Sequence, residues 1–384
     1  MGSHNFIKLS ASYFWYFAIL GLIVPFLSVF LDGRGFNSRE IGEILAIIAA
    51  TKILGPPIWA NMADKAPKLL PIIQQGTLLA TLSFALLYVV ESYWLIAGIL
   101  AIFSLFWNAV LPQLEVLTLG SVKYSAKIYA RIRLWGSIGF VVLAVVAGEV
   151  IGTWGSDTFI TLGMATVGCL YLSTLTIHER NRRKQVNVQS GALIHKIFHI
   201  NFLLFFCAGL LLQMSLGPFY SFFALFLRDL DYPQWSVGLY MSIGVIAEIG
   251  IFIVAGRLYQ AFGTKWLIVF SLFATALRWW LTADYGGVWW MLALVQVLHA
   301  TSFGLYHSAS LQFLQQHFTK AQQNRGQAIY IAGVYGIGGA AGAYLAGIVW
   351  LDGVGAQWSF QLAALASLTA AFIAMCLKQT QSRC

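Results

Sequence analysis

Several ionisable side chains interrupt long apolar stretches of this sequence, and each of them is costly in such surroundings. The segment SIGVIAEIGIFIVAG, residues 242–256, holds a single charge, Glu248. An ionised carboxylate at the centre of a bilayer costs about 2.5–3.5 kcal/mol on insertion scales. Glu248 must therefore find a cation, take up a proton, or do both in turn. The third option would make it a group that exchanges a counter-ion for a proton.

A candidate cluster in the first half of the chain combines an acid with a base. Glu115 and Arg133 lie near the ends of two apolar runs joined by a short loop, so they can face each other across one antiparallel pair of helices. The pair either binds a ligand or is a structural salt bridge between the helices. Lys52 places another cation halfway along an earlier run, and His307 is a further ionisable residue in a late run.

A second candidate cluster surrounds Glu248. Counted along their apolar runs, Glu248 and His299 lie at depths that differ by only a few ångströms at about 1.5 Å per residue. Arg278 is closer to the end of its run, but its long side chain can reach inward. Alternatively it extends to the membrane surface beside Trp279 and Trp280. Glu248, Arg278 and His299 can therefore form one cluster within the membrane.

Long apolar helices must position these residues, because the chain is 59% hydrophobic and only 10% charged. Soluble domains carry about 25% charged residues, and a membrane-spanning helix needs about 20 apolar residues. The sequence therefore predicts an all-α membrane protein with twelve transmembrane helices. They are expected at residues 6–31, 38–62, 69–90, 93–118, 127–151, 157–177, 201–227, 235–257, 265–283, 288–316, 324–350 and 356–377.

The net charge of +9 is distributed asymmetrically between the loops on the two sides of the membrane. If the N-terminus is cytoplasmic, the opposite side keeps only Arg34, Arg39 and Arg228 among the basic residues. This pattern follows the positive-inside rule. We expect a multi-pass protein of a bacterial inner membrane with both termini in the cytoplasm. The basic charge then reflects topology and predicts no nucleic-acid partner.

The longest polar segment, HERNRRKQVNVQSGALIHK at 178–196, separates six spans from six. We expect two six-helix bundles, at residues 1–178 and 201–384, joined by a cytoplasmic linker at residues 179–200.

A weak internal repeat supports this division. The segments ANMADKAPKL, 60–69, and GRLYQAFGTK, 256–265, occupy the same place in each half. Both resemble the loop signature of the major facilitator superfamily, which implies that superfamily's fold. The resemblance implies a charged gating latch at Asp64 and Lys65.

The run YARIRLWGSIGF resembles a segment of the oligosaccharide:proton symporters, the lactose-permease-like branch of that superfamily. The resemblance implies that Glu115 and Arg133 bind substrate and that Ser137 and Phe140 line the same site. In the second half, AEIGIFIVAGRLYQAFGTK, LRWW and QVLH resemble the coupling region of that branch and carry its glutamate, arginine and histidine. The resemblance implies a proton-coupling role for Glu248, Arg278 and His299.

Two departures from that branch concern the coupling region. Ser302 stands where a carboxylate follows the histidine, and Gln296 stands where a lysine precedes it. Glu248 therefore becomes the best candidate for the protonated site. The whole chain also resembles the phenylpropionate permease family, 3-phenylpropionic acid transporters, through VPFLSVFL, RLWGS, AEIGIF and QVLHATSFGLYH.

The resemblance implies a proton-coupled symporter that moves a small organic substrate by alternating access. An aromatic carboxylate such as 3-phenylpropionate suits a cavity with more cations than acids and with aromatic walls. The candidate walls are Tyr16, Trp135 and Phe140. A sugar, an oligosaccharide or a nucleoside is the alternative, because a Glu–Arg pair supplies the acceptor and donor that hydroxyl groups need.

Other classes of protein fit the sequence less well. It has no G-x-x-x-x-G-K-[ST] loop for ATP and no repeated filter segment of a channel. We expect no enzymatic activity. The four cysteines have no paired spacing, which predicts neither a disulfide framework nor a metal site. We expect no cofactor other than the proton gradient. The expected partners are a small substrate, protons and the lipid bilayer, and the expected state is a monomer.

Overall fold

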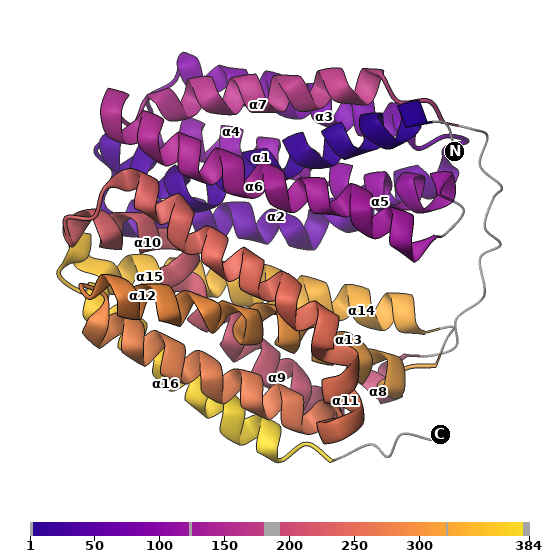
Figure 1. Ribbon diagram of the computed structural model, residues 1–384, viewed down its shortest axis with the longest axis vertical. Coiled ribbons are helices and arrows are strands. Elements are labelled where there is room, and N and C mark those ends of the chain that lie inside the picture. The colour runs from indigo at the N-terminus through magenta and orange to yellow at the C-terminus, as the bar shows by residue number, and fades with distance from the viewer. Residues whose placement is uncertain (1–2, 123–124, 180–192, 320–321, 379–384) are drawn as a thin grey trace. The chain divides into compact units, whose positions relative to one another are not determined.

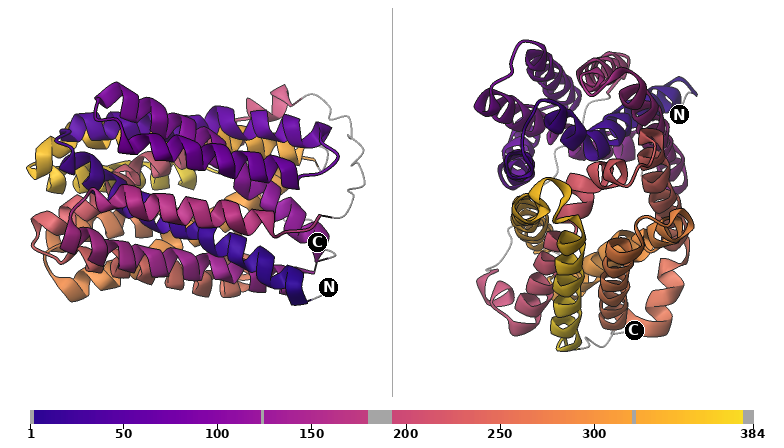
Figure 2. Two further views of the ribbon diagram at one scale, coloured as in Figure 1. Left: turned by 90° about the horizontal axis from the view of Figure 1, so that it is seen from above. Right: turned by 90° about the vertical axis from the view of Figure 1, so that its left-hand side faces the viewer.

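The computed structural model of the chain describes residues 3–122, 125–179, 193–319 and 322–378, and their regular secondary structure is helical throughout (Figures 1 and 2). Among these residues, ten helices are long and apolar enough to cross a membrane. One of the ten contains two of the predicted spans, and the helical run from Trp289 to His317 supplies another. The twelve predicted spans are therefore all helical, and the fold class is confirmed.

The chain divides into two compact units, residues 1–185 with 231–239 and residues 186–230 with 240–384. The predicted linker, 179–200, lies mostly outside the described residues. The helices of the first unit are α1 (Ser3–Gly33), α2 (Ser38–Lys65), α3 (Leu70–Ala85), η1 (Leu86–Tyr88), α4 (Tyr93–Trp107), α5 (Val110–Ser121), α6 (Ala126–Trp154) and α7 (Thr158–Leu175).

The second unit contains most of α11 and two π-helical segments, η2 and η3. Its helices are α8 (Ile194–Ile197), α9 (Ile200–Ser215), α10 (Gly217–Asp229), α11 (Gln234–Tyr285), α12 (Trp289–Val297), η2 (Ala300–Leu305), α13 (Tyr306–His317), α14 (Gln323–Tyr330), η3 (Ile331–Gly338), α15 (Gly339–Trp350), η4 (Leu351–Gly353) and α16 (Ala356–Met375).

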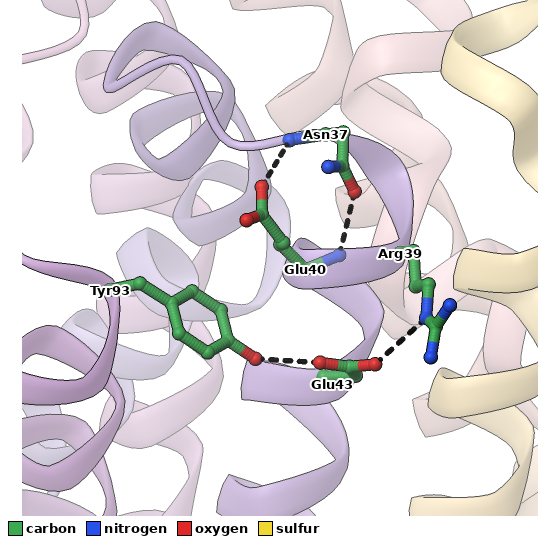
Figure 3. Close-up of polar contacts among 5 residues, drawn as sticks. All are labelled: Asn37, Arg39, Glu40, Glu43 and Tyr93. Atoms are coloured by element: carbon green, nitrogen blue, oxygen red, sulfur yellow. Dashed lines mark hydrogen bonds and ion pairs between the residues drawn. The ribbon is translucent and has the colours of Figure 1, made fainter.

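Polar side chains fix the start of α2 (Figure 3). The Asn37 side chain accepts a hydrogen bond from the backbone N–H of Glu40, whose carboxylate accepts one from the N–H of Asn37. This capping box satisfies two backbone donors that the first turn leaves unpaired. One turn further on, the Glu43 carboxylate accepts from the Tyr93 hydroxyl at 2.8 Å and from Arg39 Nε at 3.0 Å. The start of α2 is thereby tied to α4.

Gly263 divides α11 into two helices. Its φ of 72° and ψ of 164° are not helical, and glycine adopts such angles at little steric cost. The ribbon of α11 doubles back on itself (Figure 1). The spans predicted at 235–257 and 265–283 are therefore two antiparallel limbs of one hairpin.

Four of the predicted spans are interrupted. The fourth breaks between α4 and α5, and the seventh breaks between α9 and α10, where Pro218 has no N–H to give to the preceding turn. The tenth and eleventh contain η2 and η3. Membrane helices tolerate such breaks where protein surrounds the backbone, and transporters use broken helices at their binding sites.

Small residues allow close packing of helix backbones in both units. In the second unit, Gly338 and Gly342 face Leu210 and Met214 of α9, where a Cβ would meet main-chain atoms at 2.6–3.1 Å. In the first unit, α1 packs along α6. A Cβ on Gly139 would overlap the carbonyl of Phe14 there.

We expect Gly139→Leu to destabilise the protein by more than the ~1–3 kcal/mol typical of overpacking, because the obstacle is backbone and cannot rotate away. Thermal unfolding of the purified protein in detergent measures the effect. The control is Gly168→Leu in α7, where a Cβ would meet nothing within 4 Å. Equal melting temperatures for the two variants would contradict the packing account.

Candidate functional site

The first unit holds a polar cluster around Glu115 of α5. Glu115 Oε1 lies 3.9 Å from Arg133 Nε of α6, and it accepts a hydrogen bond from the Tyr129 hydroxyl at 3.3 Å. The side chains of Glu115 and Arg133 are 37% and 34% exposed. The structure thus brings the predicted acid and base together at the limit of ion-pair distance. Both keep an accessible surface toward a ligand.

Aromatic rings hold the Arg133 guanidinium in place. Its central carbon lies 3.9 Å from the centroid of the Phe17 ring and 5.9 Å from that of Tyr13, both on α1. Such cation–π contacts are worth about 0.5–2 kcal/mol, depending on how far the pair is desolvated. A Cβ on Gly136 would lie 2.6 Å from the Phe17 ring and 3.1 Å from Arg133 Nη1. Gly136 therefore leaves the space in which this stack forms.

Other predicted binding residues are placed differently around this cluster. Ser137 and Phe140 are half-buried and follow Arg133 by one and two turns on the same face of α6. Tyr16 is buried and stacks on Trp107 at 4.1 Å between centroids. Trp135 is 44% exposed and lies about 200° around α6 from Arg133. The structure does not bring Trp135 to the cluster.

Lys52 and the predicted latch residues have accessible side chains. Lys52 lies midway along α2, is exposed, and has no ion pair with a described acid. Asp64 and Lys65 in the last turn of α2 are exposed and form no ion pair with any described residue. Glu179 is the acid that contacts this loop: it accepts the N–H groups of Leu69 and Leu70 at 2.9 and 2.8 Å. An anion at a helix N-terminus is stabilising.

The second unit contains a buried guanidinium. Arg278 is 0% exposed, so it does not extend to the membrane surface, and that alternative is wrong. Its Nη1 lies 3.1 Å from His299 Nδ1, and its Nη2 donates to Gln296 Oε1 at 3.1 Å. The rings of Phe219 and Trp279 lie 4.4 and 4.3 Å from its central carbon. The structure thus joins Arg278 to His299.

Two donors in this second cluster lack an acceptor. Arg278 Nε and Gln296 Nε2 are buried and form no hydrogen bond among the described residues. Arg278 also forms no ion pair with a described acid. Burying a donor without a partner costs about 1–3 kcal/mol, and burying a charge costs more. The cluster is therefore incomplete and suits an acceptor with negative charge.

Glu248 lies on the first limb of α11, against the helix that carries His299. A Cβ on Gly304 would lie 2.8 Å from Glu248 Cγ, and a Cβ on Gly244 would lie 3.1 Å from His299 Cγ. Gly244 precedes Glu248 by one helical turn, so both are on the same face. The structure therefore brings Glu248, His299 and Arg278 to one region of the second unit.

Sequence reasoning assigned no role to three residues that complete these clusters, Tyr129, Gln296 and Phe219, although it noted Gln296 as a departure from the related branch. Tyr129 precedes Arg133 by one helical turn, a spacing that could have indicated a shared face. Gln296 precedes His299 by three residues and could have been found in the same way. Phe219 belongs to another helix, and only tertiary structure shows its contact. Among the described residues, no three His, Cys, Asp or Glu side chains are grouped so that they could hold a metal ion.

Residues 6–362 match the model of the MFS_1 like family. The chain belongs to this family. It is 26% identical over 366 residues to the "Probable 3-phenylpropionic acid transporter" of Escherichia coli (strain K12), covering 94% of this chain and 95% of that one. It is 25% identical to the "Maltose permease" of Geobacillus stearothermophilus, covering 88% and 84% of the two chains.

A solved structure shares the fold. The crystal structure of the nucleoside transporter NupG superposes with a TM-score of 0.84 over 98% of this chain and 99% of that one, at 20% identity. A mutant form of the same transporter superposes with a TM-score of 0.89. The protein is thus a multi-pass membrane protein of a transporter family, in agreement with the superfamily predicted from the repeated loops.

We expect the Glu115–Arg133 pair to contribute little to stability, because both side chains are about one-third exposed and 3.9 Å apart. A double-mutant cycle with Glu115→Gln and Arg133→Gln, read by the free energy of unfolding, should give a coupling energy of about 0.2–1 kcal/mol. A coupling of several kcal/mol would favour the alternative of a structural salt bridge.

Proposed function

We propose that this protein is a proton-coupled symporter of a small aromatic carboxylate, such as 3-phenylpropionate, working by alternating access between its two units. The full-length similarity to a transporter named for 3-phenylpropionic acid supports this substrate class. Transporters with internal repeats bind substrate between the repeats and expose the site to each side in turn.

The observation that carries the proposal is the buried guanidinium of Arg278, whose hydrogen-bond partners are His299 and Gln296 and include no acid. Two N–H donors of this cluster, on Arg278 Nε and Gln296 Nε2, have no acceptor among the described residues. A substrate carboxylate has one negative charge and two acceptor oxygens, so it can neutralise the arginine and accept from Arg278 Nε and Gln296 Nε2. Phe219 and Trp279 flank the guanidinium and favour an aromatic ligand beside it.

The position of Glu248 supports the proposed proton coupling. The carboxyl lies in an apolar span next to the helix of His299, so its charged form is stable only while a cation or a polar partner is close. When the substrate carboxylate engages Arg278, a proton on Glu248 removes the repulsion between the two acids. Loss of that proton would accompany substrate release.

The same proposal includes the membrane topology and the oligomeric state of the protein. The distribution of Lys and Arg favours a topology with both termini in the cytoplasm. The similarity to a transporter of Escherichia coli supports a bacterial inner membrane as its location. We propose a monomer that needs no cofactor beyond the proton gradient. Asp64 and Lys65 are proposed to act as a latch at the cytoplasmic face.

Symport of a sugar, oligosaccharide or nucleoside is the second candidate. Glu115 and Arg133 place an acceptor and a donor side by side with both side chains accessible, an arrangement that suits vicinal hydroxyl groups. The similarity to a protein named maltose permease supports this candidate.

We expect Arg278→Lys to weaken binding of 3-phenylpropionate to the purified protein at least tenfold, because lysine lacks the planar fork and stacks poorly between two rings. Gln296→Leu should weaken it by a similar factor through loss of one donor. Binding is measured by calorimetry, with 3-phenylpropanol as the ligand control that lacks the carboxylate.

The protein control for this experiment is Arg257→Lys, an exposed arginine on the same long helix. It should bind 3-phenylpropionate as the unmodified protein does. If 3-phenylpropanol competes as well as the acid, or if maltose and nucleosides bind instead, the carboxylate proposal fails.

We expect Glu248→Gln to abolish pH-driven accumulation of 3-phenylpropionate in proteoliposomes while exchange of internal for external substrate continues, because glutamine mimics a permanently protonated carboxyl. Glu149→Gln, an exposed acid on α6, is the matched control and should accumulate substrate normally. Retained accumulation in Glu248→Gln would show that another group carries the proton.

A further inference from the structure

The proposed function does not use the half-buried pair His307 and Tyr335 of the second unit. His307 Nδ1, on α13, lies 3.0 Å from the hydroxyl of Tyr335, in η3. The sequence marks His307 as an ionisable residue inside a span, where such groups are expensive and functional by default. Its imidazole is half-buried and its ring meets that of Tyr335 edge-on, at 6.3 Å between centroids.

Both partners lie at π-helical segments. His307 follows η2 by two residues, and Tyr335 lies inside η3. π-Segments are rare and are frequently found at functional sites, because each holds an extra residue that re-aims the side chains around it. Two elements therefore depart from regular α geometry where this pair forms.

The π-segment η2 also connects the two histidines of the tenth span. His299 stacks on Phe303 with centroids 5.8 Å apart and planes 4° from parallel, and Phe303 stacks on His307 at 6.1 Å and 7°. The three rings occupy one face of the helix. Their positions place His307 about 12 Å further along the helix than His299. On the predicted topology, that direction leads to the cytoplasm.

Glu248 is level with the middle of this stack. Its Cγ faces Gly304, which lies between the two histidines in the chain. The absence of a side chain on Gly304 is what lets the Glu248 side chain approach η2. The acid that is proposed to carry the proton therefore faces the tenth span about one helical turn before His307, on the non-cytoplasmic side of the His307–Tyr335 pair.

The groups around His307 are acidic or neutral. Tyr335 faces it from η3. Glu248 faces this region from α11, and the Tyr330 hydroxyl of α14 bonds to Ser310 at 3.2 Å and approaches Tyr306 at 3.5 Å on the helix of His307. The buried cation Arg278 contacts His299, at the far end of the stack. A proton on His307 is thus further from Arg278 than a proton on His299 would be, and the repulsion between the two positive charges is weaker.

We propose that Tyr335 and His307 form a proton-release site that takes the proton from Glu248 and passes it to the cytoplasmic side. This inference rests on the proposed proton coupling. The Tyr335 oxygen accepts the proton of the Glu248 carboxyl while its own O–H proton moves to His307 Nδ1. His307 then loses its Nε2 proton to water. Glu248 ends as a carboxylate, Tyr335 and His307 end neutral, and one proton is released.

The test uses Tyr335→Phe and His307→Gln, each reconstituted as the full chain in proteoliposomes with labelled 3-phenylpropionate. Net efflux and pH-driven uptake require deprotonation, whereas exchange at equal pH does not. We expect both variants to slow net efflux and uptake at least tenfold and to keep exchange within about twofold of the unmodified protein. Tyr330→Phe, another buried hydroxyl of the second unit, is the control and should leave all three rates unchanged.

A second measurement needs no substrate. After a pH jump, infrared spectroscopy follows the carboxyl band of Glu248, assigned by its loss in Glu248→Gln. We expect Tyr335→Phe to slow deprotonation at least tenfold. Unchanged deprotonation, or exchange that falls in parallel with efflux, would overturn the release site. Slowed deprotonation in a protein that does not accumulate 3-phenylpropionate would support the release site and defeat the proposed substrate alone.

Discussion

The constraint behind this structure is that a charge inside an apolar bundle must be neutralised by its neighbours or by a mobile partner. The two units meet it in opposite ways. Glu115 and Arg133 oppose each other and stay partly exposed, so each reduces the cost of the other. Arg278 is completely buried among an imidazole, an amide and two aromatic rings. None of these groups can carry the negative charge that would neutralise the guanidinium. The surroundings of Arg278 therefore suit a bound anion, which would supply the missing negative charge.

The fold supplies the positions at which such side chains can meet. Glu115 follows a break between α4 and α5, His299 immediately precedes η2, and Tyr335 lies in η3. In a regular α-helix, side chains return to the same face every 3.6 residues, which limits the directions in which polar groups can point. The breaks change that interval locally, and glycines such as Gly136 and Gly304 remove the side chains that would block the resulting contacts. Polar chemistry and irregular backbone therefore occur together.

The twelve spans could be predicted from the sequence because each one is an apolar run of bilayer length. Counting residues along the helices predicted that Glu248 and His299 lie at similar depths. The same count predicted that Glu115 and Arg133 face each other. Trp135 shows a limit of motif-based reasoning, since helical geometry alone puts it opposite Arg133. Contacts such as Gln296 with Arg278, or Glu179 with the start of α3, depend on tertiary packing. A window of hydropathy also cannot distinguish a π-segment from an α-helix.

The turn at Gly263 has a mechanical consequence for the second unit. Glu248 and Arg278 are each fifteen residues from this glycine, on opposite limbs of the α11 hairpin. At about 1.5 Å per residue, both side chains are roughly 22 Å from the same pivot, and their lever arms are equal. A change of about 5° in the angle between the limbs would alter the separation of the acid and the base by about 2 Å. One flexible residue could thus convert a small tilt into the making or breaking of an electrostatic contact.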